Sequence, residues 1–360
     1  MSGIRIRKLH VRPLNFKLDR PLETAGGQIG SWPVVILDMH TDAGIVGVSF
    51  VGCFMPMLVK PVVSLLQDMG AMIEGDELSP VSIEAKLRAK SRLIGTQGPI
   101  AMAVAMIEIS AWDALSKASN LPLCRLLGAK PRAHPVYLTI PAMTPSRVRE
   151  LAQRALELQY AGVKCKLGHP DPSKDLALID AVRSVCGPNF PIMVDYNQSL
   201  SVPDAIQRIQ RLDDMGLGWI EEPTDAMNVE GHVKIANAVK TPVSLGENWH
   251  NPMEAARDIL SGAADVVMPD VLTVGGISAW LKCAALAEIR GIPISAHSYP
   301  EISTQLLPLA ATPHWLEHAE IFDSLFLNPV RPVNGNLIAT EDPGCGVAWD
   351  EKVVARSAWT

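Results

Sequence analysis

The chain has 360 residues, of which 48% are hydrophobic and 19% are charged, and its mean hydropathy is +0.16. These values exclude a disordered chain, and the length predicts two lobes or one large barrel with additions. The net charge of −6 provides no basic surface for nucleic acid or for an anionic membrane, so neither is expected as a partner.

The first 130 residues have the pattern of a small α+β unit. A strand is expected over 4–11, and two more, over 34–39 and 45–51, flank a predicted hairpin turn. Helical patterns follow over 62–73, from 80 onward and over 99–117. Ser79, which precedes Pro80, is expected to supply the oxygen that caps the second of these helices.

From residue 131 onward, short apolar runs alternate with amphipathic segments. Eight runs occur, at 136–139, 163–166, 192–195, 219–221, 243–245, 266–268, 294–296 and 315–317. Eight such repeats are typical of a parallel barrel and favour it over an open doubly wound sheet. We therefore expect an α/β fold with an α+β domain at 1–130, a barrel at 131–318 and a C-terminal segment at 319–360 that returns to the first domain.

The sequence contains no apolar run close to the roughly twenty residues that a membrane span requires. The longest, Ile100 to Ile107, ends at Glu108, and no signal-type apolar core follows the N-terminus. The six cysteines are scattered singly without a CxxC pair, which indicates reduced thiols and a cytoplasmic protein.

Carboxylates stand at three consecutive strand ends. Asp195 ends the third run, Glu221 ends the fourth, and Glu247 follows the fifth. In a parallel barrel these ends meet at one mouth, where three carboxylates repel one another unless a cation lies between them. One such acid alone would more simply cap a helix or pair with a surface base. Three at equivalent positions predict a site for Mg²⁺, which prefers oxygen ligands.

Lys164 and Lys166 end the second run. Alternation along a strand places both side chains on one face, here the barrel interior. Two adjacent ammonium groups disfavour each other's charged form, which would suit one of them to act as a base near neutral pH. A lone pair of this kind is usually solvated charge, but beside three carboxylates it indicates a catalytic base.

The last three strand ends carry an acid, a histidine and a second acid. Asp270 follows the sixth run, and it could orient His297 at the end of the seventh and raise its basicity. Taken alone, His297 would be an interior structural histidine. Glu317, at the end of the eighth run, could stay protonated in a low-dielectric pocket and donate a hydrogen bond. Glu222, next to Glu221, is expected to face away from the interior.

Two bases around one cation suit a particular kind of reaction. A substrate carboxylate would bind the cation, and removal of its α-proton would give an enediolate whose charge the site stabilises. If one base removes the proton and the other delivers a proton to the opposite face, the result is racemisation or epimerisation.

The combination of motifs resembles the enolase superfamily and, within it, the mandelate racemase subgroup. The motifs that carry the resemblance span the chain: Ala111 to Leu115 with Leu126-Leu127-Gly128, Lys164-Cys165-Lys166, Asp195-Tyr196-Asn197, Trp219 to Pro223, Gly246 to Trp249, Pro269-Asp270, His297 and His314 to Glu317. Members of the muconate cycloisomerase subgroup carry a lysine after the sixth strand. Asp270 stands there in this chain, which favours the mandelate racemase subgroup.

The resemblance implies a modified TIM barrel, (β/α)7β, under an N-terminal α+β capping domain. It also implies the role of each site residue: Mg²⁺ on Asp195, Glu221 and Glu247; Lys166 and the His297–Asp270 pair as the two bases; Lys164 beside the substrate carboxylate; Glu317 as the acid; and Asn197 as a hydrogen-bond donor to the substrate. The expected partner is a small-molecule carboxylate, and a homo-oligomer is expected.

Departures from the subgroup fall on the expected substrate pocket. Thr139 stands where mandelate racemases have a serine, and the capping loops contain Gly26, Gly52 and Phe54. The two glycines remove apolar bulk, which predicts a pocket that is larger than one for mandelate or differently shaped.

Three functions fit these residues. The first is a Mg²⁺-dependent racemase or epimerase of a 2-hydroxy acid. The second is an acid-sugar dehydratase, in which the same enediolate loses a β-hydroxyl with His297 as the acid. Such a substrate needs polar contacts, which Glu23, Thr24, Gln28 and Thr139 could provide, although the loops are not rich in Arg or Asn. The third is a Mg²⁺-dependent binding protein without turnover.

Overall fold

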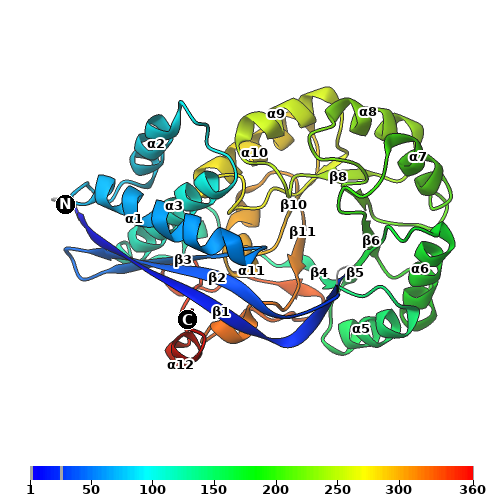
Figure 1. Cartoon of the computed structure of the whole chain (residues 1–360), viewed down its shortest axis with the longest axis horizontal. Coiled ribbons are helices and arrows are strands. Elements are labelled where there is room, and N and C mark those ends of the chain that lie inside the picture. Colours follow the sequence, from blue (N-terminus) through cyan, green and yellow to red (C-terminus); the bar gives the residue numbers. More distant parts are fainter. Residues whose placement is uncertain (1–2, 25–26, 360) are drawn as a thin grey trace.

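The N-terminal domain is built on a three-stranded antiparallel sheet of β1 (Ile6–Thr24), β2 (Gly27–Thr41) and β3 (Val46–Gly52). The computed structural model describes residues 3–24 and 27–359. β1 continues well past the strand expected at 4–11, because Leu14, Phe16 and Leu18 are buried at every second position. The far end of the β1–β2 hairpin reaches across to the second domain (Figure 1).

Three helices cover this sheet: α1 (Val59–Ile73), α2 (Pro80–Ser91) and α3 (Pro99–Ala118). α1 buries Val62, Leu66, Met69 and Ile73, which share one helical face. The cap predicted for α2 is wrong in one respect. The hydroxyl of Ser79 donates to Oγ of Ser82 at 2.8 Å and makes no cap hydrogen bond to the backbone, so Pro80 alone sets the first turn.

Among the described helices, α3 is the one that is long and apolar enough to cross a membrane. However, 78% of its most apolar window is buried inside the protein. α3 packs against β3 on one side and contacts α10 (Ile277–Arg290) of the second domain on another, which explains why it is apolar nearly all round.

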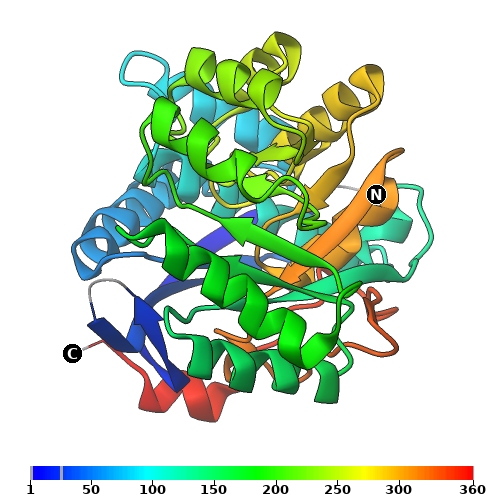
Figure 2. The same ribbon diagram turned by 90° about the vertical axis from the view of Figure 1, so that its right-hand side faces the viewer.

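The second domain is a closed parallel barrel, as predicted. Its eight strands pair in sequence order, and β11 closes the ring by pairing with β4. They are β4 (His134–Ile140), β5 (Gly162–Lys166), β6 (Ile192–Asp195), β7 (Ile220–Glu221), β8 (Val243–Leu245), β9 (Val266–Val267), β10 (Ile294–Ala296) and β11 (Pro313–His318). All eight predicted runs coincide with these strands. Seven helices connect them, so the fold is a (β/α)7β barrel with an N-terminal cap (Figures 1 and 2).

The connecting helices form the outer layer of the barrel. They are α5 (Pro145–Glu157), α6 (Pro172–Cys186), α7 (Val202–Gln210), α8 (Val229–Ala238), α9 (Pro252–Ser261), α10 and α11 (Pro300–Leu306). Short elements complete the chain: α4 (Leu123–Leu126), β12 (Asn336–Leu337), α12 (Glu351–Arg356) and three 3-10 turns, η1 (Pro56–Leu58), η2 (Leu307–Leu309) and η3 (Asp323–Leu325).

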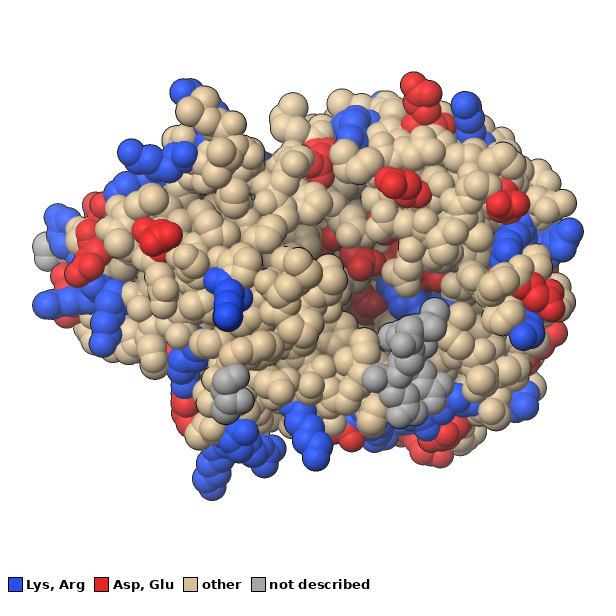
Figure 3. Space-filling view, viewed as in Figure 1, with Lys and Arg blue, Asp and Glu red and all other residues tan. Residues whose placement is uncertain are grey.

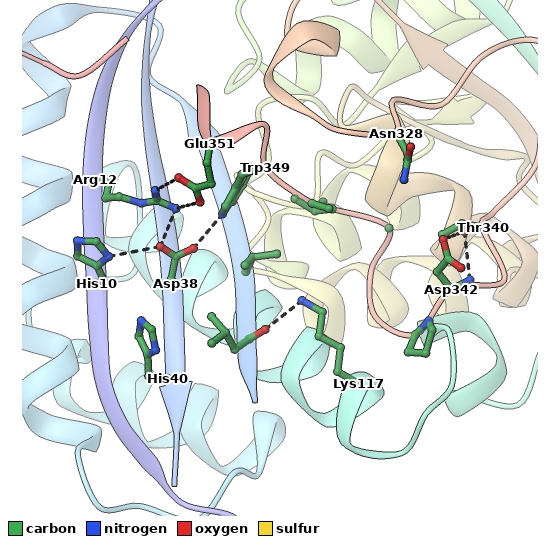
Figure 4. A pocket seen from close by; sticks show the side chains of 16 residues that line it. His10, Arg12, Asp38, His40, Lys117, Asn328, Thr340, Asp342, Trp349 and Glu351 are labelled. Carbon is green, nitrogen blue, oxygen red and sulfur yellow. Dashed lines mark hydrogen bonds and ion pairs between the residues drawn. The ribbon is translucent and has the colours of Figure 1, made fainter. Parts of the chain in front are cut away.

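The C-terminal segment runs from the barrel back to the capping sheet. β12 pairs antiparallel with β4, and α12 then lies beside β1, where Ala358 bridges Leu14 (Figure 2). Figure 4 shows the attachment: the guanidinium of Arg12 contacts Asp38 at 2.8 Å and Glu351 at 2.7 Å. The indole of Trp349 donates to Asp38 at 2.9 Å. These contacts tie the end of the chain to the sheet on which the cap is built.

A layer of aromatic side chains fills the barrel interior. Tyr137, Met193 and Trp219 form a buried cluster with Trp315 packed against it, and the rings of Tyr137 and Trp219 meet edge to face at 5.6 Å. The barrel is therefore filled below this layer, and the space for a ligand lies at the C-terminal ends of the strands.

Candidate active site

Four polar residues lie one step above the aromatic layer, at the mouth of the barrel. Thr139, Asp195, Glu221 and Glu317 each follow a member of that layer by two residues, and residues two apart in a strand share a face. All four side chains are buried. The alternation of the strands thus builds a polar layer directly on an aromatic one.

Two lysines of β5 neutralise part of this layer. Lys164, which is fully buried, donates to both carboxylate oxygens of Glu221, at 2.9 and 2.8 Å, and contacts Glu317 at 2.9 Å. Lys166 is hydrogen bonded to Asp195. Lys164 was predicted to touch the substrate carboxylate, but it does not line the cavity in this structure and lies beneath its floor.

The ion pairs outweigh the lowering of pKa that the two lysines were expected to cause in each other. Burial and Lys164 do lower the pKa of Lys166, but the charge of Asp195 outweighs them, so the pKa is raised. For Lys164, burial is outweighed by Glu221 and Glu317, and its pKa is raised well above the ordinary value. A close carboxylate stabilises an ammonium more than a neighbouring ammonium destabilises it.

The predicted histidine–aspartate pair is present in the structure. Nδ1 of His297 lies 2.8 Å from Oδ2 of Asp270, so its other nitrogen, Nε2, faces the cavity. Nε2 lies 3.5 Å from Glu247 and 3.4 Å from Glu317. Burial lowers the pKa of His297, but the charges of Glu247 and Glu317 and the bond to Asp270 raise it to about 10.

The pKa of Glu317 is lowered in this structure, whereas the neutral form expected of it requires a raised pKa. Burial raises its pKa, but the charges of Lys164 and His297 and the hydrogen bond from Thr139 lower it far more, so the pKa lies below its usual value. Its second oxygen accepts a hydrogen bond from the backbone N–H of Ser298 at 3.1 Å. In this structure Glu317 is therefore a hydrogen-bond acceptor, because two cations face it.

Glu247 reaches the mouth on a turn that requires glycine. Gly246 has a φ of 137°, and a Cβ there would lie 2.8 Å from the backbone of Met268. Oε2 of Glu247 is buried without a hydrogen-bond partner among the described residues. Ligand atoms of Glu221, Glu247 and His297 lie within 4.8 Å of one another, so two of the three predicted carboxylates converge beside His297. Asp195, the third, is instead hydrogen bonded to Lys166 in this structure.

Glu222 is closer to this group than the sequence suggested. It was expected to face away from the interior, but it is 1% exposed, and Nδ2 of Asn248 donates to it at 2.6 Å. Burial and the charges of Glu247 and Glu221 raise the pKa of Glu222 well above its ordinary value. Strand alternation fails here because β7 has two residues and Glu222 takes a left-handed conformation, with a φ of 37°.

A cavity of about 390 Å³ opens above the polar layer, between the barrel and the cap. Its floor holds Lys166, Asn197, Glu247, His297 and Glu317, and the polar residues Thr139, Tyr196, Ser199, Asp270, Ser298 and Tyr299 also line it. The apolar lining residues form a wall: Leu22, Ile29, Trp32, Phe54, Pro141, Met143, Ile321 and Phe322. Figure 3 shows the hollow with charged atoms at its bottom and uncharged surface around it. Trp32 and Phe322 were not predicted, since no motif marks them.

The predicted substrate residues occupy different parts of the cavity. Thr139 lines it and is hydrogen bonded to Glu317. Asn197 also lines it, but its amide donates to Asp195 at 3.1 Å. Phe54 stands at the edge, 53% exposed. Gly26 lies outside the described residues, as do the side chains of Glu23, Thr24 and Gln28.

Gly52 was expected, with Gly26, to make the pocket larger or differently shaped, and its neighbours show what occupies the space beside it. A Cβ at Gly52 would lie 2.7 Å from Cζ of Phe322 and 3.0 Å from Nε1 of Trp32. The space released by this glycine is therefore filled by two aromatic side chains.

Comparison with known proteins places this geometry in a family. Residues 6–128 match the model of the mandelate racemase / muconate lactonizing enzyme N-terminal domain, and residues 147–353 match that of the enolase C-terminal domain-like family. The chain belongs to the enolase superfamily, in the mandelate racemase subgroup.

Relatives of this enolase-superfamily enzyme differ in their reactions. The L-talarate/galactarate dehydratase of Salmonella typhimurium is 33% identical over 75% of this chain and 69% of its own. An enolase from Bradyrhizobium, crystallised with magnesium and mandelic acid, is 36% identical over the full length of both chains, with a TM-score of 0.96. L-Talarate dehydratase from Polaromonas, crystallised with magnesium and L-glucarate, is 27% identical over 99% of this chain and 98% of its own, with a TM-score of 0.92.

The residues of this superfamily member fit the magnesium that those relatives contain. Asp195, Glu221 and Glu247 supply only oxygen donors, from three adjacent strands. Acids outnumber bases in this group, and Oε2 of Glu247 accepts no hydrogen bond from the residues described, although Nε2 of His297 lies 3.5 Å from it. A divalent cation would balance both the charge and the unused acceptor.

Proposed function

We propose that this protein is a Mg²⁺-dependent racemase or epimerase that acts on a 2-hydroxy acid with an apolar substituent. The observation that carries the proposal is that the cavity has a charged floor and an apolar wall. Two candidate bases, Lys166 and His297, stand in a charged floor, and an apolar wall faces them. A substrate that fits has a carboxylate and hydroxyl at one end and an alkyl or aryl group at the other.

The roles of the residues follow from their positions. Mg²⁺ held by Asp195, Glu221 and Glu247 would supply a positive charge that stabilises the enediolate. Lys166 on β5 and His297 after β10 reach the cavity from different sides, so each would transfer the proton on one face of the α-carbon. Asp270 would hold the ring of His297 with Nε2 toward the substrate.

Dehydration of an acid sugar is the second candidate, favoured by relatives that are named for it. An acid sugar carries hydroxyl groups along its chain, and each needs a hydrogen-bond partner when it is buried. Asn197, Ser199 and Ser298 could serve some of them, but the wall residues Trp32, Phe54, Met143 and Phe322 offer few such partners. This contrast favours racemisation.

A homo-oligomer and a cytoplasmic location stay predictions from the sequence.

A substrate panel separates the two candidates. Pure enantiomers of 2-hydroxy acids with methyl, isobutyl and phenyl substituents, together with galactarate and glucarate, should be incubated with the protein and Mg²⁺. Optical rotation reports racemisation, and trapping with semicarbazide reports keto acids. We expect loss of rotation for the apolar acids and no keto acid from the sugars. Keto-acid formation from a sugar, with the apolar acids unchanged, would favour the dehydratase.

The apolar wall should set the preference for the substituent. Phe322→Leu removes aromatic bulk from the wall and should shift the ratio of kcat/KM toward bulkier substituents by about tenfold, within the range that one or two carbon atoms in a pocket provide. Phe326→Leu is the matched control, because Phe326 packs on Phe50 at 5.2 Å but does not line the cavity. If the two variants change the ratio equally, Phe322 does not contact the substrate.

Magnesium binding should release protons. Without metal, the pKa of His297 is raised to about 10, and burial is the main cause that raises that of Glu221 to about 8. A cation repels the proton of His297 and favours ionised Glu221, so both pKa values fall on binding. The affinity should therefore rise with pH up to about pH 8 through Glu221 and on to about pH 10 through His297. Calorimetry in buffers of different ionisation enthalpy measures this release. A pH-independent affinity would contradict it.

A further inference from the structure

The segment that carries His297 is joined to the capping domain through a tyrosine two residues further on. The backbone N–H of Gly52, at the end of β3, donates to the hydroxyl of Tyr299 at 3.1 Å, and both residues are buried. Gly52 belongs to the cavity wall and Tyr299 lines the same cavity. One hydrogen bond therefore connects the cap loop to the turn that follows the base.

This turn has an unusual backbone. Ser298 and Tyr299 both have positive φ angles, 49° and 46°, which residues other than glycine rarely adopt. Such a conformation persists only where its surroundings hold it. Each residue of the turn is held by a different part of the site: His297 by Asp270, the N–H of Ser298 by Glu317, and Tyr299 by Gly52.

The ring of Tyr299 packs against two aromatic side chains. It meets Phe50 of β3 edge to face at 5.1 Å and stacks on Phe322 at 6.5 Å. Phe50 belongs to the capping sheet, and Phe322 also contributes to the cavity wall. The phenol thus contacts the cap both through its ring and through its hydroxyl.

We infer that Tyr299 is a positioning residue that aligns His297 with the capping domain. Lys166 lies on β5 and is hydrogen bonded to Asp195 within the barrel. Loss of the Tyr299 hydroxyl should therefore disturb proton transfer on the His297 face and leave the Lys166 face unchanged. The inference rests on the proposed function, because it requires two faces to compare.

The test is Tyr299→Phe, which removes one oxygen and keeps the ring. Each enantiomer of the 2-hydroxy acids with methyl, isobutyl and phenyl substituents is incubated with Mg²⁺ in D₂O, and NMR follows loss of the α-hydrogen. The His297-face enantiomer is the one that stops exchanging in His297→Asn. Its exchange should slow by about 10- to 100-fold in Tyr299→Phe, the scale of a small misplacement of a reacting group. Exchange of the other enantiomer should not change.

Tyr160→Phe is the matched control. The hydroxyl of Tyr160 is 2.8 Å from Nδ1 of His318, outside the cavity, so this variant also loses one buried phenol hydrogen bond. It should affect the two enantiomers equally. Hydrogen–deuterium exchange of the peptide over 46–54 gives a second measurement: the Gly52 amide should lose protection in Tyr299→Phe and keep it in Tyr160→Phe.

The outcomes distinguish this inference from the proposed function. If wild-type protein exchanges neither enantiomer of any acid in the panel, the proposed function fails and the inference falls with it. If wild-type protein exchanges both, equal slowing of both enantiomers or no slowing in Tyr299→Phe overturns the role of Tyr299 alone. Should Tyr299→Phe not fold, Phe50→Leu loosens the same ring and must slow the same enantiomer selectively.

Discussion

With His297 replaced by Asn, racemisation should fall by about 10²- to 10⁴-fold, the usual contribution of a general acid–base group. Lys166 stays in place on β5, so the variant should still remove the α-proton from one enantiomer. In D₂O that enantiomer should exchange its α-hydrogen without inversion, because no proton donor remains on the opposite face. NMR of each pure enantiomer measures the exchange directly.

Lys166→Met is the reciprocal variant and should reverse the pattern. The enantiomer that exchanges in His297→Asn should then be inert, and the other should exchange. Asn and Met both remove a proton-transfer group while leaving a side chain of similar size. If both enantiomers exchange in His297→Asn, one base or solvent reaches both faces, and the two-base mechanism has to be abandoned.

The second large effect concerns the cation. Glu221→Gln should abolish Mg²⁺-dependent activity, because it removes a charged ligand from the centre of the three predicted ones. The fold should survive the change. Gln keeps the shape of Glu and an acceptor oxygen for Lys164, and Lys164 retains its contact with Glu317 at 2.9 Å. Titration calorimetry with Mg²⁺ and thermal unfolding measure the two parts of this prediction.

Glu301→Gln is the control for Glu221→Gln. Glu301 is also a buried carboxyl, 2% exposed, and burial raises its pKa to about 7, but it does not line the cavity. It should bind Mg²⁺ as the wild type does. A Glu221→Gln variant that remains fully active, with activity that survives a chelator, would show that the ligand assignment is wrong.

The barrel could be predicted because its strand–helix units repeat at regular intervals, and the spacing of the apolar runs in the sequence shows this repeat. Each predicted run became a strand, and the polar residues that end these runs gather at one mouth. Strand alternation also accounts for Lys164 and Lys166 sharing the interior face. These are local regularities, and a single sequence contains them.

The wall of the cavity could not be predicted in the same way. Trp32 comes from β2 and Phe322 from the segment after β11, so they meet only when the cap and the C-terminal segment are folded onto the barrel. Gly52 shows why composition misleads here. A missing side chain suggests open space, but neighbours from elsewhere in the chain fill it.

Charge states also depend on distances that the sequence does not contain. The sequence argument considered only the effect of Lys164 and Lys166 on each other. In the structure, nearby carboxylates raise the pKa values of both lysines. Glu222 was assigned an outward direction from strand alternation, but the strand ends before it and the backbone turns. The alternation of side chains along a strand therefore predicts directions poorly at the end of a strand as short as β7.

The most direct test of the central claim is the α-hydrogen exchange of wild-type protein. Each pure enantiomer of mandelate is incubated with Mg²⁺ in D₂O beside a parallel sample of galactarate, and NMR follows all three. The account predicts that both enantiomers acquire deuterium and interconvert while galactarate is unchanged. Conversion of galactarate to a keto acid, with both enantiomers of mandelate retaining their α-hydrogen, would contradict it.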